Sequence, residues 1–220
     1  MKDHIIIYSH GFDVQKDARG MFTDIANALP NVQHIMFDYN EIDEANNTLT
    51  AVSLEKQAEK LTEIYEKTIS ENPNATIDLI CHSQGCTATG LAKLNARKTI
   101  LLAPKMNNTH GSLRRLVETR PGTTEKNGVT YWPRRDGSTT IIDQDYWQSY
   151  DNLKNTDELY NKLASITKLS IVVATQDEVL GKVDCSNIDK NISIIEIDSD
   201  HDFNGEARQK MIEIVKEILQ

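Results

Sequence analysis

Cysteine is scarce in this sequence, and long apolar runs are absent from it. Cys81, Cys86 and Cys185 form neither a CxxC pair nor a Cys/His array with zinc-like spacing, so we expect no disulfide framework and no structural metal. The apolar run at 5–8 is too short for a signal-peptide core or a membrane span. These absences favour a cytoplasmic location.

Positive charge is also in short supply. The chain of 220 residues carries 24 Lys and Arg against 33 Asp and Glu, a net charge of −9. This charge repels phosphate backbones and anionic lipid surfaces, so neither nucleic acid nor a membrane is an expected partner. Because no repeat or Gly/Pro/Ser-rich linker divides the chain, one domain with a substantial core is the default. The sequence leaves the oligomeric state open, a homodimer included.

Short apolar runs alternate with amphipathic segments along most of the chain. We expect strands at 5–9, 32–37, 76–80, 99–102, 169–174 and 192–197, and helices at 21–29, 52–69, 85–94 and 206–219. Such alternation is typical of a parallel sheet covered by helices on both faces. The predicted fold class is therefore α/β, with a doubly wound, mostly parallel sheet.

Residues 105–167 interrupt the alternation, and we interpret them as an insertion in a core made of 1–104 and 168–220. Two strand-like runs, 129–132 and 138–142, flank the turn signal Asp136-Gly137 and predict a β-hairpin. Both tryptophans and four of the seven tyrosines lie between 131 and 160. These aromatic residues either pack the insertion onto the core or line a substrate site. The candidates for the substrate site are Tyr131, Trp132 and Trp147.

The insertion is also locally basic. Seven Lys or Arg lie between 105 and 135, against two Glu. A solvated face lying against an acidic body is the simpler interpretation, and attraction of anionic substrates is the alternative. The seven are Lys105, Arg114, Arg115, Arg120, Lys126, Arg134 and Arg135.

One serine has the setting of a nucleophile. The stretch Cys81-His82-Ser83-Gln84-Gly85 follows the apolar strand at 76–80 and precedes a helix of small residues. A serine on a tight strand-to-helix turn, with small residues two positions away on each side, projects its hydroxyl clear of the backbone. A chance turn of this composition is the alternative.

A serine nucleophile needs a base, and the base needs an orienting carboxylate. His201 follows the last predicted strand, and both Asp177 and Glu178 follow the strand before it. Open α/β sheets place their sites at these carboxyl ends. The position after the strand alone leaves both Asp177 and Glu178 open as the acid. The oxyanion of the reaction would be held by the backbone N–H groups of Phe12 and Gln84.

From the His10-Gly11-Phe12 loop to Asp177 and His201, the sequence resembles the α/β-hydrolase superfamily of serine hydrolases. Two departures are Cys81, where the family usually has glycine, and Cys86, where it often has glycine or alanine. A first strand at Ile5 implies a sheet trimmed at the N-terminus. The resemblance favours Asp177 over Glu178 as the acid, because the family's acid usually has an apolar residue close behind it, as Val179 is here. The stretch 18–22 and the hairpin-bearing insertion are similar to small bacterial carboxylesterases of the feruloyl or cinnamoyl kind. That likeness implies a lid at 105–167.

The resulting hypothesis is hydrolysis of small or aromatic acyl esters through an acyl-enzyme on Ser83, with a small-molecule ester as partner and no cofactor. The same groups could cleave a thioester, an amide or a carbon–carbon bond. A non-catalytic binding module is the remaining alternative.

Overall fold

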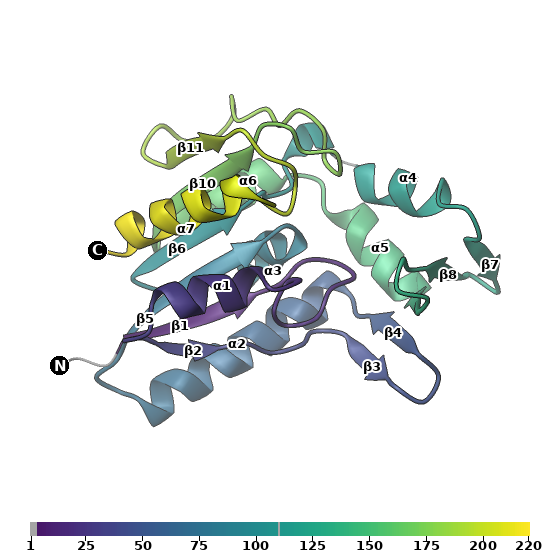
Figure 1. The fold of residues 1–220 in the computed structure, drawn as a ribbon, viewed down its shortest axis with the longest axis horizontal. Coiled ribbons are helices and arrows are strands. Elements are labelled where there is room, and N and C mark those ends of the chain that lie inside the picture. The colour runs from purple at the N-terminus through teal and green to yellow at the C-terminus, as the bar shows by residue number, and fades with distance from the viewer. Residues whose placement is uncertain (1–3, 110) are drawn as a thin grey trace.

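A six-stranded parallel sheet, sheet A, forms the centre of the molecule in the computed structural model (Figure 1). The structure describes residues 4–109 and 111–220. The strand order is β11-β10-β6-β5-β1-β2, and every neighbouring pair is parallel. The strands are β1 His4–Ser9, β2 Gln33–Ile35, β5 Thr76–His82, β6 Lys98–Leu102, β10 Lys168–Ala174 and β11 Ser193–Ile197. The predicted α/β class with a doubly wound parallel sheet is confirmed.

Helices cover both faces of sheet A. The helices α2 (Leu54–Glu71), α3 (Gln84–Ala92) and α6 (Thr156–Ala164) lie on one face, while α1 (Met21–Ala28) and α7 (Glu206–Leu219) lie on the other. A strand buried on both faces carries mostly apolar side chains, which explains the apolar runs of the sequence. None of the helices among the described residues is long and apolar enough to cross a bilayer.

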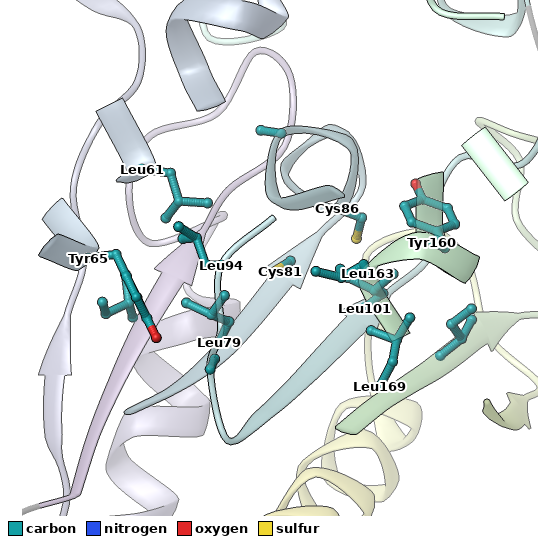
Figure 2. Packing of buried hydrophobic residues seen from close by; sticks show 14 of the residues in the cluster. Leu61, Tyr65, Leu79, Cys81, Cys86, Leu94, Leu101, Tyr160, Leu163 and Leu169 are labelled. Atoms are coloured by element: carbon teal, nitrogen blue, oxygen red, sulfur yellow. The ribbon is translucent and has the colours of Figure 1, made fainter. Parts of the chain in front are cut away.

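Side chains of each central strand divide between two hydrophobic clusters. In β1, Ile5 and Ile7 enter the cluster beneath α2, α3 and α6, whereas Ile6 and Tyr8 enter the cluster beneath α1 and α7. This division follows from the two-residue period of a strand. Figure 2 shows the first cluster, in which Leu79 of β5 packs among side chains from the neighbouring helices.

A second, smaller sheet, sheet B, lies beside the carboxyl ends of sheet A. Its order is β3-β4-β9-β8-β7, with β4 and β9 parallel and the other pairs antiparallel. The strands are β3 Glu41–Asp43, β4 Thr48–Ala51, β7 Thr124–Lys126, β8 Val129–Pro133 and β9 Thr139–Ile142. The hairpin predicted around Asp136-Gly137 is present as β8 and β9. Its turn is held by the Asp136 carboxylate, which accepts the Ser138 backbone N–H at 3.0 Å.

Several elements of this region were not predicted from the sequence. They are the strands β3, β4 and β7, the 3-10 turn η1 (Asn107–Thr109), and the helices α4 (Ser112–Glu118), α5 (Gln144–Asn152) and α6. Strands β3 and β7 are three exposed residues each, so they carry no alternating pattern. Because β3 and β4 precede residue 105, sheet B joins the predicted insertion to an earlier segment. The division of the chain at 105 and 167 stays a prediction.

Candidate active site

Ser83 lies on a strained turn between β5 and α3. Its backbone has φ 53° and ψ −122°, a conformation that residues with a Cβ rarely adopt. The Ser83 N–H donates to the Leu102 carbonyl at 2.9 Å, which fixes the turn to β6. A Cβ on Gly85 would lie 2.1 Å from the Ser9 carbonyl oxygen, so only glycine allows α3 to approach β1 this closely. The turn thus has the geometry expected of a nucleophile elbow.

The unusual Cys81 fits this turn as a small buried side chain. It is fully buried, and its sulfur lies 3.0 Å from the Thr89 hydroxyl. Burial raises the pKa of the Cys81 thiol to about 12, and burial also raises the pKa of Cys86 well above its usual value. Both thiols therefore stay protonated near neutral pH and pack as small apolar groups.

Three predicted residues form a hydrogen-bonded chain at the carboxyl ends of three strands. The Ser83 Oγ lies 2.9 Å from His201 Nε2, and His201 Nδ1 lies 2.6 Å from Asp177 Oδ2. The other carboxylate oxygen, Asp177 Oδ1, accepts the backbone N–H groups of Val179 at 2.9 Å and Leu180 at 2.7 Å. These two N–H groups orient the carboxylate, and the carboxylate in turn orients the imidazole.

Glu178, the alternative acid, has a different contact. Its Oε2 accepts the backbone N–H of His201 at 3.1 Å and so holds the main chain rather than the ring. The structure therefore puts Asp177, not Glu178, against the imidazole. In this arrangement the Ser83 hydroxyl donates to a neutral His201, whose Nδ1–H donates to Asp177, which is the relation needed for proton removal from serine.

The loop after β1 runs beside Ser83 and is held by a buried histidine. The Tyr39 N–H donates to His10 Nε2 at 2.9 Å, so His10 Nδ1 carries the proton and donates to the Gly11 carbonyl at 2.8 Å. Burial lowers the pKa of His10, which keeps it neutral in this role. Phe12 and Gln84 both line the cavity that holds Ser83. Gln84 is the first residue of α3, where backbone N–H groups have no acceptor within the helix.

Solved structures with this architecture are esterases and other hydrolases. The esterase domain of a Rhodothermus marinus protein is 16% identical, with 98% of this chain and 85% of that chain covered and a TM-score of 0.64. Est1E from Butyrivibrio proteoclasticus with bound ferulic acid is 16% identical over 99% and 90% of the two chains, with a TM-score of 0.69. The α/β hydrolase GrgF from Penicillium sp. sh18 is 18% identical over 99% and 90%, with a TM-score of 0.71. No family model and no curated protein matches the chain.

The chain has the α/β-hydrolase fold. The first strand among the described residues is β1 at His4–Ser9, and the trimming of the fold at the N-terminus stays a prediction.

A second histidine lies behind the catalytic candidates of this α/β-hydrolase fold. His82 Nε2 is 3.1 Å from the His201 carbonyl oxygen, and the two rings are 4.9 Å apart between centroids. Burial, followed by the neighbouring His201, lowers the pKa of His82 to about 4. His82 is therefore neutral at pH 7, and its Nε2–H donates to the carbonyl oxygen. This contact adds a third restraint on the position of His201.

Of the described groups, the side chains of His82, His201 and Asp202 have the spacing that a metal ion could use. Their ligand atoms lie within 4.8 Å of one another. Asp202, however, is ion-paired with Arg19 at 2.7 Å, and the two histidines bond to Ser83, Asp177 and the main chain. The absence of a metal in the reaction stays a prediction.

One of the three predicted aromatic residues lines the cavity. Trp132 does, with its ring 5.7 Å from that of Phe12. Trp147 and Tyr131 are not among the lining residues: the Trp147 Nε1–H donates to the Thr130 hydroxyl at 3.1 Å, and Tyr131 is 37% exposed. Five lining residues gave no signal in the sequence, namely Leu54, Leu113, Leu116, Leu153 and Leu180, whereas the lining residues Lys105 and Tyr150 belong to the basic and aromatic groups noted there. A leucine in a helix has the same pattern whether it lines a core or a cavity.

The hairpin of sheet B is tied to the loop that carries Phe12. The buried Asp13 carboxylate lies 3.0 Å from the Nε of Arg134 and also accepts the Thr140 hydroxyl. The Arg134 Nη2 donates to the Asp13 carbonyl at 3.0 Å. Burial raises the pKa of Asp13, and the charge of Arg134 opposes that rise. These bonds tie β8 and β9 to the loop that carries Phe12.

Proposed function

We propose that this protein is a serine esterase that hydrolyses carboxylic esters through an acyl-enzyme on Ser83. The observation that carries the proposal is the hydrogen-bonded chain from Ser83 through His201 to Asp177, on a strained elbow inside an apolar cavity. The same fold in esterases such as Est1E gives this interpretation further support.

The proposed reaction has two half-reactions. Ser83 Oγ attacks the ester carbonyl while His201 Nε2 takes its proton, and the N–H groups of Phe12 and Gln84 bind the oxyanion. His201 then protonates the leaving alcohol. Water activated by His201 attacks the acyl-enzyme, and the acid leaves as Ser83 regains its proton.

Small or aromatic acyl groups are the proposed substrates. The cavity combines leucines with the rings of Phe12 and Trp132, which suits a flat apolar group. The ferulic acid bound to Est1E is a flat aromatic acid of this kind.

The test compares wild type with Ser83→Ala on p-nitrophenyl acetate and methyl ferulate. We expect kcat to fall by roughly 10⁴-fold or more, because the nucleophile is lost, with an unchanged circular dichroism spectrum. Thr89→Val, on the same helix but outside the cavity, is the control and should retain turnover. Substantial hydrolysis by purified Ser83→Ala would refute the proposal.

A further inference from the structure

A buried tyrosine of α5 contacts the side chains of both residues proposed to bind the oxyanion. Tyr146 is fully buried, and its hydroxyl donates to Gln84 Oε1. Its ring lies 5.4 Å from the ring of Phe12 between centroids. Tyr146 is not among the described residues that line the cavity. Any effect of Tyr146 on a reaction in the cavity must therefore pass through neighbouring side chains.

The bond between Tyr146 and Gln84 belongs to a chain of three hydrogen bonds. Gln84 Nε2 donates to Gln57 Oε1 on α2 at 3.1 Å, and Gln57 Nε2 donates to the Val52 carbonyl at 2.7 Å. Gln57 is 1% exposed, so this chain is shielded from water. The amide of Gln84 is thus held from two sides, by α2 and by α5.

The direction of this chain is fixed at its Val52 end. A carbonyl oxygen can only accept, so the Gln57 amide turns its NH₂ group toward Val52 and its oxygen toward Gln84. The Gln84 amide then presents its own NH₂ group to Gln57 and its oxygen to Tyr146, which leaves the tyrosine as the donor. Burial raises the pKa of Tyr146 well above its usual value, so the hydroxyl keeps the proton that it donates. Hydrogen bonds in such a chain strengthen one another.

The two helices that hold Gln84 are also joined to each other. Asp143 caps α5 and accepts the backbone N–H of Tyr146 at 2.8 Å. Ser149, on the same helix, accepts the backbone N–H of Leu54, the first residue of α2, at 2.9 Å. The partners of Gln84 therefore lie on a rigid frame.

Gln84 needs such support because it follows the strained backbone of Ser83. A φ of 53° at Ser83 persists only where the surroundings over-determine it. The Gln84 N–H starts α3 and has no acceptor within that helix, so its direction depends on the peptide between Ser83 and Gln84. A Gln84 side chain held from two sides restrains this peptide.

We infer that Tyr146 is a positioning residue, which acts through the side chain of Gln84 to keep the Gln84 backbone N–H aimed at the oxyanion. The inference rests on the proposed esterase function. A donor stabilises a developing charge most when its position is fixed beforehand. Helix α5 of the insertion would therefore contribute to transition-state stabilisation through a residue that does not touch the substrate.

The experiment compares wild type with Tyr146→Phe, which removes the hydroxyl and keeps the ring beside Phe12. All rates are expressed per active site, counted with a fluorophosphonate. The first measurement is kcat/KM for p-nitrophenyl acetate. The second is the inhibition constants of two matched ketones, phenethyl trifluoromethyl ketone and phenethyl methyl ketone.

The two ketones differ in whether they form an oxyanion. Ser83 Oγ adds to the carbonyl carbon of the trifluoromethyl ketone, His201 takes the serine proton, and the carbonyl oxygen becomes an oxyanion. The methyl ketone binds without this addition. The ratio of the two inhibition constants therefore reports on the oxyanion site and not on the fit of the phenethyl group.

We expect Tyr146→Phe to lower kcat/KM by roughly ten-fold, which is less than the roughly 10²- to 10³-fold loss on removing an oxyanion donor outright. The inhibition constant of the trifluoromethyl ketone should rise by a similar factor. That of the methyl ketone should stay within about two-fold of wild type, because the Gln84 N–H is engaged by the oxyanion.

Tyr65→Phe is the matched control. Tyr65 is 7% exposed, and its hydroxyl donates to the Asn95 carbonyl at 2.5 Å, outside the cavity. Both tyrosine variants should lower the urea midpoint, since each removes the hydroxyl of a buried hydrogen bond. Tyr65→Phe should nevertheless keep the kcat/KM and the ketone ratio of wild type.

Gln84→Met tests whether Tyr146 acts through Gln84. The methionine keeps the backbone N–H and loses both side-chain bonds, so we expect kcat/KM to fall by about ten-fold or more. Adding Tyr146→Phe to this variant should change kcat/KM by less than about two-fold, because the hydroxyl no longer has Gln84 Oε1 as its acceptor.

A wild-type kcat/KM and ketone ratio in Tyr146→Phe would overturn the positioning role alone. The same conclusion would follow if Tyr146→Phe caused its full loss in the Gln84→Met background. A wild-type protein that does not hydrolyse p-nitrophenyl acetate and binds the two ketones equally would overturn the esterase proposal, and this inference with it.

Discussion

Two buried carboxylates lie at opposite ends of sheet A, and their partners differ in kind. Near the start of β5, Asp78 accepts the Arg97 Nε–H at 3.0 Å and the Arg97 Nη2–H, and its Oδ2 also lies 2.6 Å from His4 Nε2. Past the end of β10, Asp177 accepts the Nδ1–H of His201 at 2.6 Å. Asp78 is thus paired with a guanidinium, which is always charged, as well as with a histidine, whereas the side-chain partner of Asp177 is an imidazole alone.

Because of this difference, we expect Asp78 to contribute to the stability of the fold and Asp177 to contribute to catalysis. Arg97 also donates to the Leu219 carbonyl at 2.9 Å, so the Asp78 cluster ties β5 and β6 to the last turn of α7. The guanidinium of Arg97 takes no part in the proposed reaction and keeps its positive charge throughout it. In the proposed reaction, Asp177 instead faces an imidazole that gains a positive charge when it takes the serine proton, so the attraction between Asp177 and His201 would be strongest in the transition state.

The largest expected effect comes from Asp177→Asn. The asparagine oxygen can still accept the Val179 and Leu180 N–H groups, but its amide faces His201 Nδ1 and favours the wrong tautomer. We expect kcat/KM for p-nitrophenyl acetate to fall by about 10⁴-fold, with the melting temperature little changed.

Glu178→Gln is the matched control for this change. The glutamine oxygen can still accept the His201 backbone N–H, so we expect less than about a ten-fold loss. A loss confined to the Glu178 variant would reverse the assignment of the orienting acid.

A substitution beside Asp78, at the opposite end of sheet A, should lower the stability of the protein and leave its activity unchanged. Arg97→Met leaves the fully buried Asp78 without its guanidinium, and we expect unfolding by urea to cost about 3 kcal/mol less. The kcat/KM of the folded variant should equal that of wild type.

Lys67→Met is the control for Arg97→Met. It removes an exposed pair with Glu71 at 3.8 Å and should change stability by less than about 0.5 kcal/mol. Wild-type stability of Arg97→Met, together with a large loss of activity, would remove the distinction between the two carboxylates.

An effect of similar size is a pH dependence of stability from His82, at the end of β5. Its pKa is about 4 in the folded protein because of burial, against about 6.5 when unfolded. Between these values the unfolded chain binds a proton that the folded protein does not, so stability falls as the pH falls. The slope is about 1.4 kcal/mol per pH unit, or roughly 3 kcal/mol from pH 6.5 to 4.

Urea midpoints at pH 7, 6, 5 and 4 would measure this dependence. His82→Gln should flatten the curve over that interval by the same roughly 3 kcal/mol. An identical slope in the variant would show that His82 is not the group responsible.

The sequence alone predicted the strands of sheet A and the order of Ser83, Asp177 and His201. This was possible because the spacing of apolar residues along the chain predicts the strands. In a parallel sheet the carboxyl ends of the strands lie at one edge, so residues that follow different strands come close together there. The choice between Asp177 and Glu178 needed coordinates, since adjacent residues differ only in which way their side chains point.

The lining of the cavity could not be predicted in the same way. Trp132 and Trp147 have similar sequence surroundings, yet only Trp132 lines the cavity, because α5 turns Trp147 toward Thr130. Of the seven basic residues between 105 and 135, Lys105 lines the cavity, and its sequence surroundings do not distinguish it from the other six. In both cases the packing of distant segments decides which side chain reaches the cavity.

The most direct test of the central claim is covalent labelling with a fluorophosphonate, read by peptide mass spectrometry and followed over time. We predict one adduct, on Ser83, forming at the wild-type rate in folded Arg97→Met and at least about a hundred-fold more slowly in Asp177→Asn. An adduct on another residue, or equal labelling rates in Asp177→Asn and wild type, would contradict the proposed roles of Ser83, His201 and Asp177.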